Sequence, residues 1–201
     1  FNTTSEMIGF YYGLKEGGVD QAIEIVKWAA FLDHMIDPEG AQVRIAARAH
    51  EEAARIKAYA EAHPGRPITL VGYSGGAWFA VATAERLDPS VSVDRILMMS
   101  PAIRRDYDLT AALAKTRLGA VCFWSPLDTF TVTIAATFNL ADSTKSEPAA
   151  TFSFDMDDPR LHEIEYDPAW REYGYYGEHE EYLLLVGWIA EFVTPWVATT
   201  E

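Results

Sequence analysis

Positions 67–78 read P-I-T-L-V-G-Y-S-G-G-A-W, and this stretch decides the fold. The apolar run 68–71 predicts a short buried strand, and residues 77–87 predict a helix. Between them, Gly72 to Gly76 matches Gly-x-Ser-x-Gly, a pattern that puts a serine on a sharp, strained strand-to-helix turn. Side chains two residues before or after the serine would collide across such a turn, which explains both flanking glycines. The stretch therefore predicts a nucleophile elbow at Ser74 rather than a glycine-rich turn with a bystander serine.

Apolar runs alternate with helical patterns through most of the chain. This alternation predicts an α/β fold with a mostly parallel sheet covered by helices on both faces, in one domain over residues 1–201. Thr3 to Glu6 resembles a capping box before the first helix. Besides the elbow, we expect strands at 22–28, 95–99, 120–124, 151–154 and 163–166, and helices at 7–14, 42–62, 109–116, 131–138 and 180–193.

The composition of the chain disfavours several kinds of binding partner and a membrane-spanning segment. The 201 residues are 49% hydrophobic and carry a net charge of −14, which disfavours nucleic acid and anionic membranes as partners. No apolar run is long enough to span a bilayer. The single cysteine, Cys122, lies in the apolar run 120–124, so we expect a buried thiol and no intrachain disulfide. A lone cysteine favours a cytoplasmic location and leaves export open.

Asp128 is the candidate acid for a serine site. It follows the predicted strand 120–124 in a Ser-Pro-Leu-Asp turn, and polar groups gather where parallel strands end at their carboxyl edge. Its alternative role is to cap the helix that follows. Asp106 and Asp108, which follow the preceding strand, are the rival acids.

His179 is the candidate base, because it lies in a loop that opens the last predicted helix. The alternative is a surface histidine near a helix start. Three nearby glutamates would favour a protonated imidazole if they lay close to it. His162 is the main competitor, because it also follows Asp128. The flanking glutamates are Glu178, Glu180 and Glu181, and the histidines that precede the elbow are His34, His50 and His63.

The order Ser74, Asp128, His179 resembles the core of the α/β-hydrolase superfamily. The segments Gly72 to Ala77, Ser100 to Ala102 and Tyr107 to Leu109 are more narrowly similar to bacterial α/β-hydrolase-like proteins of the esterase and lipase type. The resemblance implies Ser74 as nucleophile, His179 as general base and acid, and Asp128 as its orienting partner.

The same resemblance implies an oxyanion hole that uses the Gly75 backbone N–H. The superfamily takes a second donor from a loop before its first helix, and here only Phe1 or Asn2 occupies that place. We therefore expect residues upstream of Phe1 to supply the missing N-terminal strands. The short connection 103–107 leaves no room for a cap domain.

Aromatic residues near these positions are candidate walls of a shallow substrate site, although each is also typical of a core. They are Tyr73, Trp78, Trp124, Tyr175 and Tyr176.

The leading hypothesis is a serine hydrolase without cofactor or metal that cleaves carboxylic esters through an acyl-enzyme. Thioesterase and acyltransferase activities remain open. The competing class is a binding or scaffold protein without catalysis on a hydrolase fold. A phosphate-binding protein is disfavoured, because residues 72–76 lack the lysine of a P-loop.

Overall fold

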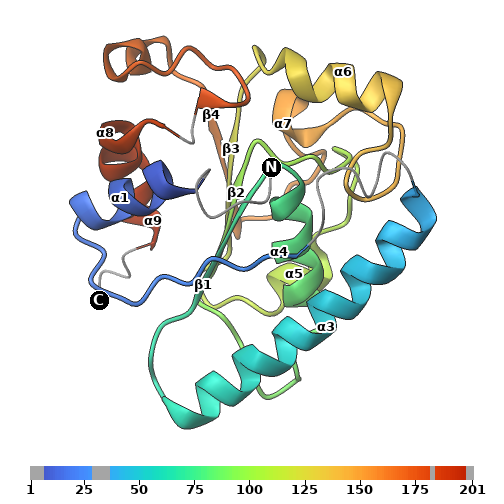
Figure 1. Ribbon diagram of the computed structural model, residues 1–201, viewed down its shortest axis with the longest axis vertical. Coiled ribbons are helices and arrows are strands. Elements are labelled where there is room, and N and C mark those ends of the chain that lie inside the picture. Colours follow the sequence, from blue (N-terminus) through green and yellow to red (C-terminus); the bar gives the residue numbers. More distant parts are fainter. Residues whose placement is uncertain (1–6, 29–36, 182–183, 198–201) are drawn as a thin grey trace.

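Four parallel strands form the centre of the computed structural model, which describes residues 7–28, 37–181 and 184–197 (Figure 1). The strands lie in the order β1-β2-β3-β4, so each pairs with its neighbour in the chain. Helices connect the strands and pack on both faces, which confirms the predicted α/β class. The strands are β1 (Thr69–Tyr73), β2 (Arg95–Met99), β3 (Ala120–Trp124) and β4 (Leu161–Glu165).

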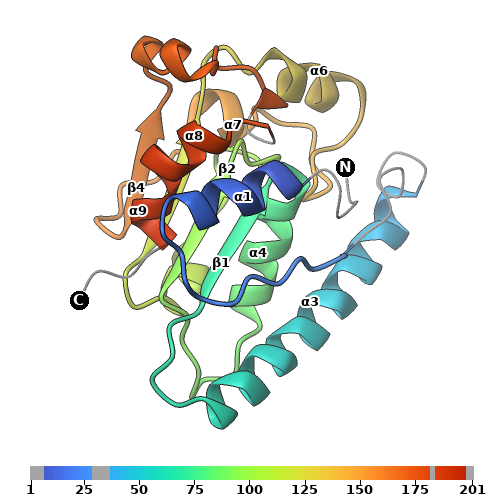
Figure 2. The ribbon, with the colours of Figure 1, turned by 60° about the vertical axis from the view of Figure 1, so that its left-hand side comes forward.

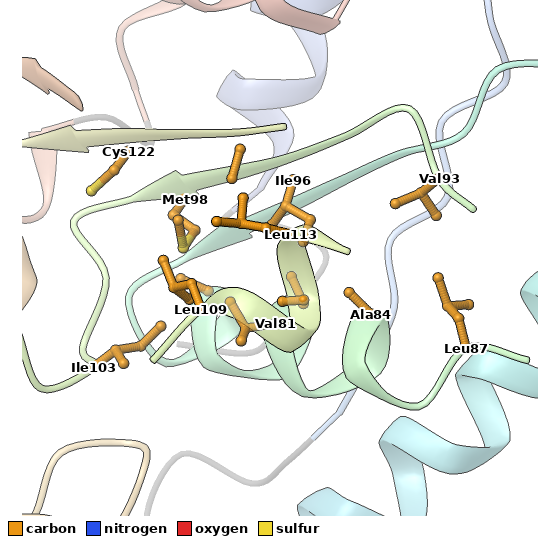
Figure 3. Packing of buried hydrophobic residues seen from close by; sticks show 14 of the residues in the cluster. Val81, Ala84, Leu87, Val93, Ile96, Met98, Ile103, Leu109, Leu113 and Cys122 are labelled. Carbon is orange, nitrogen blue, oxygen red and sulfur yellow. The ribbon is translucent and has the colours of Figure 1, made fainter. Parts of the chain in front are cut away.

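One face of the sheet is covered by α3 (Pro38–Ala62), α4 (Gly75–Glu85) and α5 (Thr110–Leu113). Side chains alternate along each strand, so Ile96 and Met98 of β2 point to this face together with Cys122 of β3. Figure 3 shows these three side chains facing Val81 of α4 and Leu113 of α5. This packing buries β2 and β3, whereas β1, which leads directly into α4, is mostly half-buried.

The opposite face is covered by segments from the two ends of the chain, α1 (Ile8–Glu16) and the continuous helical run 186–197 (Figure 2). A Cβ added at Gly13 would lie 2.6 Å from Cβ of Ile189, so only glycine lets these helices approach this closely. The strand residues that alternate with those of the first face, including Leu97 and Phe123, fill this second core. The run comprises α8 (Val186–Trp188), the π-helical turn η3 (Ile189–Val193) and α9 (Thr194–Val197), and the 3-10 helix η1 (Pro168–Tyr173) precedes it.

Two further helices, α6 (Thr129–Thr137) and α7 (Ala149–Phe152), lie beyond the carboxyl end of β3. The chain reaches α6 through the turn 125–128, and Ser125 N donates to the carbonyl of Ala150 at 2.9 Å. The carboxyl edge of the sheet is therefore flanked by helices on the side of β3.

Most predicted elements are present, and β2 and β3 have the predicted bounds. The long helix α3 starts four residues before the prediction, because Asp37 caps it by accepting a hydrogen bond from Gly40 N at 3.0 Å. Residues 3–6, the expected capping box, lie outside the described residues.

Three predictions were wrong. Residues 22–28 form neither strand nor helix, and Val26 and Trp28 pack beside α3 and α4 instead. The predicted strand 151–154 overlaps the helical turn α7, which follows Pro148. In the described part of 180–193, the α-helix begins only at Val186.

Candidate active site

Ser74 lies between the end of β1 and the start of α4. Its backbone has φ 53° and ψ −122°, a positive φ that non-glycine residues rarely adopt. The backbone N–H of Ser74 donates to Met99 O at 2.9 Å, and its carbonyl accepts from Ala102 N at 3.2 Å. These bonds to β2 and to the loop after it hold the strained turn in place, as the Gly-x-Ser-x-Gly pattern predicts.

The two flanking glycines are not equivalent. A Cβ at Gly72 would lie 2.3 Å from the carbonyl oxygen of Gly76 and 2.5 Å from the backbone of Ala77, so no side chain fits there. A Cβ at Gly76 would meet only the Trp28 indole nitrogen, at 3.6 Å. The predicted collision therefore applies to Gly72, whereas the expectation that Gly76 must also be glycine was wrong.

Three side chains from distant parts of the chain form one hydrogen-bonded series. His179 Nε2 lies 2.9 Å from Ser74 Oγ, and His179 Nδ1 lies 2.7 Å from Asp128 Oδ2. Asp128 is fully buried and His179 is 1% exposed, whereas Ser74 is partly exposed. The structure thus brings together the three residues that the sequence singled out, with the serine on the accessible side.

Asp128 has both of the roles that the sequence offered as alternatives. Oδ2 faces His179, while Oδ1 accepts a hydrogen bond from Thr131 N at 3.0 Å and so caps α6. The Asp128 carbonyl accepts from Thr151 Oγ1 at 2.9 Å, which ties the turn to α7. A capping carboxylate is held in one orientation, and that orientation fixes the second oxygen on the imidazole.

The loop that carries His179 presses against the turn before α6. Gly177 has φ +93°, and a Cβ there would lie 2.7 Å from Ser125 Oγ and 3.2 Å from Leu127. Glycine is therefore required twice at this position, for its backbone angle and for its contact. This close contact between the loop and the turn places the His179 imidazole beside Asp128.

Aromatic rings enclose the imidazole. Phe130 stacks on it at 4.9 Å between centroids, and Tyr73 contacts it at 5.0 Å. The Tyr73 hydroxyl also donates to the carbonyl of His179 at 2.9 Å. The imidazole is thereby shielded from water.

The neighbouring glutamates are directed elsewhere. Glu181 accepts hydrogen bonds from the backbone N–H groups of Tyr176 and Glu178, so it orders the loop. Glu178 accepts from the Thr129 hydroxyl at 3.4 Å, and Glu180 is exposed. None of the three has a hydrogen bond to the imidazole among the described residues.

The rival residues are not brought to Ser74. Asp106 is exposed and pairs with Arg104, and the exposed Asp108 accepts from Thr110 N at 2.9 Å. His162 is exposed on β4 and contacts the Trp196 ring. His50 and His63 are exposed residues of α3 and of its C-terminal cap, and His34 lies outside the described residues.

Gly75 is the first residue of α4, so its N–H lies in the helix turn that lacks internal acceptors. A Cβ at Gly75 would lie 3.1 Å from the Trp28 ring and 3.5 Å from Cβ of Ala141. These two side chains therefore border the site on that side. Phe1 and Asn2, the expected second oxyanion donors, lie outside the described residues.

The predicted aromatic walls have different surroundings. Tyr73 touches the imidazole, whereas Trp78 is partly buried, packs on three apolar clusters and meets Tyr107 edge to face at 5.0 Å. Trp124 packs against the core at the end of β3, and Tyr175 is fully buried. Tyr176 is 53% exposed.

The Cys122 thiol is fully buried on β3, and burial raises the pKa of this thiol well above its ordinary value. The protonated thiol is a poor nucleophile. No cluster of three or more metal-ligating side chains occurs within the described residues. In this same part of the chain, no helix has the length and apolarity to cross a membrane.

Sequence reasoning missed Thr131, Phe130 and Trp28. Thr131 stands three residues after Asp128, the spacing of a capped first helical turn, and this was the available signal. Its hydroxyl lies 2.9 Å from His179 Nδ1. The contacts of Phe130 and Trp28 depend on long-range packing, which no local pattern encodes.

Comparison with known proteins adds no family: no protein-family model, curated protein or solved structure matches the chain significantly. The fold is a four-stranded parallel α/β sheet, and the inference of function therefore depends on the geometry at Ser74.

Proposed function

We propose that the chain is a serine hydrolase that cleaves carboxylic esters through an acyl-enzyme on Ser74. The observation that carries the proposal is the 2.9 Å contact between Ser74 Oγ and His179 Nε2, in line with the 2.7 Å contact between His179 Nδ1 and Asp128. An ionised carboxylate only accepts hydrogen bonds, so Nδ1 carries the imidazole proton and Nε2 is free to accept one. A base in that tautomer is what activation of a serine hydroxyl requires.

The reaction has two halves. Ser74 Oγ attacks the ester carbonyl carbon while Nε2 takes the hydroxyl proton, and the imidazolium then gives this proton to the departing alkoxide. Water next attacks the acyl-enzyme and gives a proton to Nε2, and that proton returns to Oγ as the carboxylic acid leaves. Asp128, held as the cap of α6, stabilises the imidazolium in both halves.

The negative oxygen that forms in each half needs hydrogen-bond donors. The N–H of Gly75 stands at the start of an eleven-residue helix, where unpaired N–H groups and the helix dipole favour negative charge. Gly75 is therefore the first oxyanion donor in this proposal, and a second donor from Phe1 or Asn2 stays a prediction. Tyr73, which contacts the imidazole, and the Trp28 ring, which borders Gly75, are candidate substrate contacts in this proposal.

The direct test is hydrolysis of p-nitrophenyl acetate and p-nitrophenyl butyrate by the wild-type chain and by Ser74→Ala. We expect the variant to lose at least about 10³-fold in kcat, because it lacks the nucleophile. A fluorophosphonate probe should label the wild-type chain at Ser74, seen by peptide mass spectrometry, and abolish turnover.

Ser90→Ala is the matched control. Ser90 is an exposed serine whose hydroxyl donates a hydrogen bond to Asp88 and not to His179. This control should keep wild-type turnover and labelling. Undiminished turnover in a folded Ser74→Ala variant would refute the proposal. An unlabelled and inactive wild-type chain would instead favour the binding-protein alternative.

A further inference from the structure

We infer that Thr131 is a positioning residue that holds the His179 imidazole through a hydrogen bond of its own, an inference that rests on the proposed function. Its hydroxyl lies 2.9 Å from Nδ1, the same atom that lies 2.7 Å from Asp128 Oδ2. Nδ1 therefore has two oxygen neighbours instead of the single carboxylate of a simple triad.

The chemistry of the three groups assigns the roles. The Asp128 carboxylate can only accept, so the short Nδ1 contact places the proton on Nδ1. With the proton there, Thr131 Oγ1 also accepts from Nδ1–H, and the hydrogen bond is shared between two acceptors. Acceptors on Nδ1 stabilise the imidazolium more than the neutral ring, because the charged donor makes the stronger hydrogen bond.

Thr131 is rigidly placed for this contact. It is 1% exposed and lies in the first turn of α6, where its backbone N–H donates to Asp128 Oδ1 at 3.0 Å. One residue thus fixes the acid through its backbone and the base through its side chain. The hydroxyl lies behind the imidazole, on the ring nitrogen remote from Ser74, so it has no route to the substrate.

Among the described residues, few other ionisable groups are bonded to the imidazole or to its backbone. Tyr73 donates its hydroxyl to the His179 carbonyl, and Asp128 is the one carboxylate among the described residues that is hydrogen-bonded to the ring. Glu178 and Glu181 bond to Thr129 and to backbone N–H groups, and Glu180 is exposed. Substitution at Thr131 changes none of these groups.

Thr131→Val removes the hydroxyl at nearly constant volume and keeps the backbone N–H that caps α6. We expect kcat for p-nitrophenyl acetate to fall about 2- to 10-fold, the effect of one lost hydrogen bond, with KM unchanged. The acidic limb of the kcat/KM profile should move to lower pH, because an imidazolium with one acceptor fewer loses its proton more readily. Thr131→Ser, which restores the hydroxyl, should recover both kcat and the position of the limb.

A second measurement does not need turnover. The pKa of His179, followed by NMR titration of its ring resonances, should be lower in Thr131→Val than in the wild type and in Thr131→Ser. This comparison is also made in the Ser74→Ala background, so it decides the role of Thr131 even if esterase activity is absent. Equal pKa values in wild type and Thr131→Val, or equal loss in the Ser and Val variants, would overturn the inference.

Discussion

At the scale of single residues, the site depends on backbone positions that most side chains cannot occupy. Ser74 has a positive φ, and Gly72 faces the backbone of Gly76 and Ala77 across the turn. Strain of this kind persists only where the surroundings enforce it. Here the bonds from Ser74 N to Met99 O and from Ala102 N to Ser74 O enforce it. A strained turn of this kind holds a serine hydroxyl clear of the sheet, which the proposed role of Ser74 requires.

Gly72→Ala should be the more damaging of two similar substitutions. Its new methyl group would lie 2.3 Å from a carbonyl oxygen that belongs to backbone, so the elbow itself must move. We expect a loss of at least about 1–3 kcal/mol in the free energy of unfolding, measured by urea titration with far-UV circular dichroism. Esterase activity should fall as well, because Ser74 moves relative to His179.

Gly76→Ala is the matched control. Its methyl group would meet only Trp28 Nε1, at an ordinary 3.6 Å, and it would replace a glycine in the first turn of α4. Alanine favours helix over glycine, so stability should be unchanged or raised by up to about 1 kcal/mol. Equal losses in the two variants would show that the crowding at Gly72 does not govern the structure of the turn.

At the scale of elements, the strands that could be predicted are those whose structure follows from a local sequence pattern. Residues 96–99 of β2 and 120–123 of β3 are continuous apolar runs buried on both faces, and such runs can be recognised without a structure. The order of Ser74, Asp128 and His179 placed each residue after a strand or before the last helical run, which brings them to one edge of the sheet. The elbow and the two partner residues could therefore be predicted together.

The two wrong strand predictions have a different cause, because they concern segments whose structure is decided by distant partners. Residues 22–28 have the composition of a strand, but a strand also needs a neighbour to bond with, and this segment joins no described strand. Thr151 lies in the helical turn α7, and its hydroxyl donates a hydrogen bond to the carbonyl of the distant Asp128. Thr131 was missed for the same reason, since its contact with His179 spans 48 positions.

The amino edge of the sheet, opposite the site, is held by Asp94. This carboxylate is 10% exposed, accepts from Ile68 N at 2.6 Å and binds Arg117 through both oxygens, at 3.0 and 2.6 Å. It thus joins the chain at the starts of β1, β2 and β3. Asp94→Ala should lower the free energy of unfolding by about 1–3 kcal/mol, because the Ile68 N–H loses its acceptor. Urea titration measures the loss, and kcat at low temperature should be kept.

Glu51→Ala provides the comparison for Asp94→Ala. Glu51 is 60% exposed and pairs with Arg48 on the surface of α3, where an ion pair contributes little. We expect a change within about 0.5 kcal/mol. A loss at Glu51 as large as the loss at Asp94 would contradict the role given to the amino edge.

At the scale of the whole molecule, charge is the dominant feature. The chain has 30 acidic and 16 basic residues, so its net charge is −14. Repulsion among like charges destabilises a folded chain. At 0.1 M, salt largely screens the repulsion between exposed charges that are more than about 10 Å apart. Many of the basic side chains described are already paired on the surface, such as Arg55 with Glu24 and Glu52, and surface pairs of this kind add little stability. The remaining negative charge is unbalanced.

Thermal stability should therefore rise with salt. We expect the melting temperature to increase by about 2–4 °C between 10 and 200 mM NaCl, if screening adds about 1 kcal/mol to the free energy of unfolding. The triple variant Asp157→Asn, Glu180→Gln, Glu191→Gln removes three exposed carboxylates and should show a smaller increase. Differential scanning calorimetry at matched pH measures both chains. A melting temperature that falls with salt would mean that surface ion pairs outweigh repulsion, and an unchanged salt response in the triple variant would mean that the effect of salt is not screening of net charge.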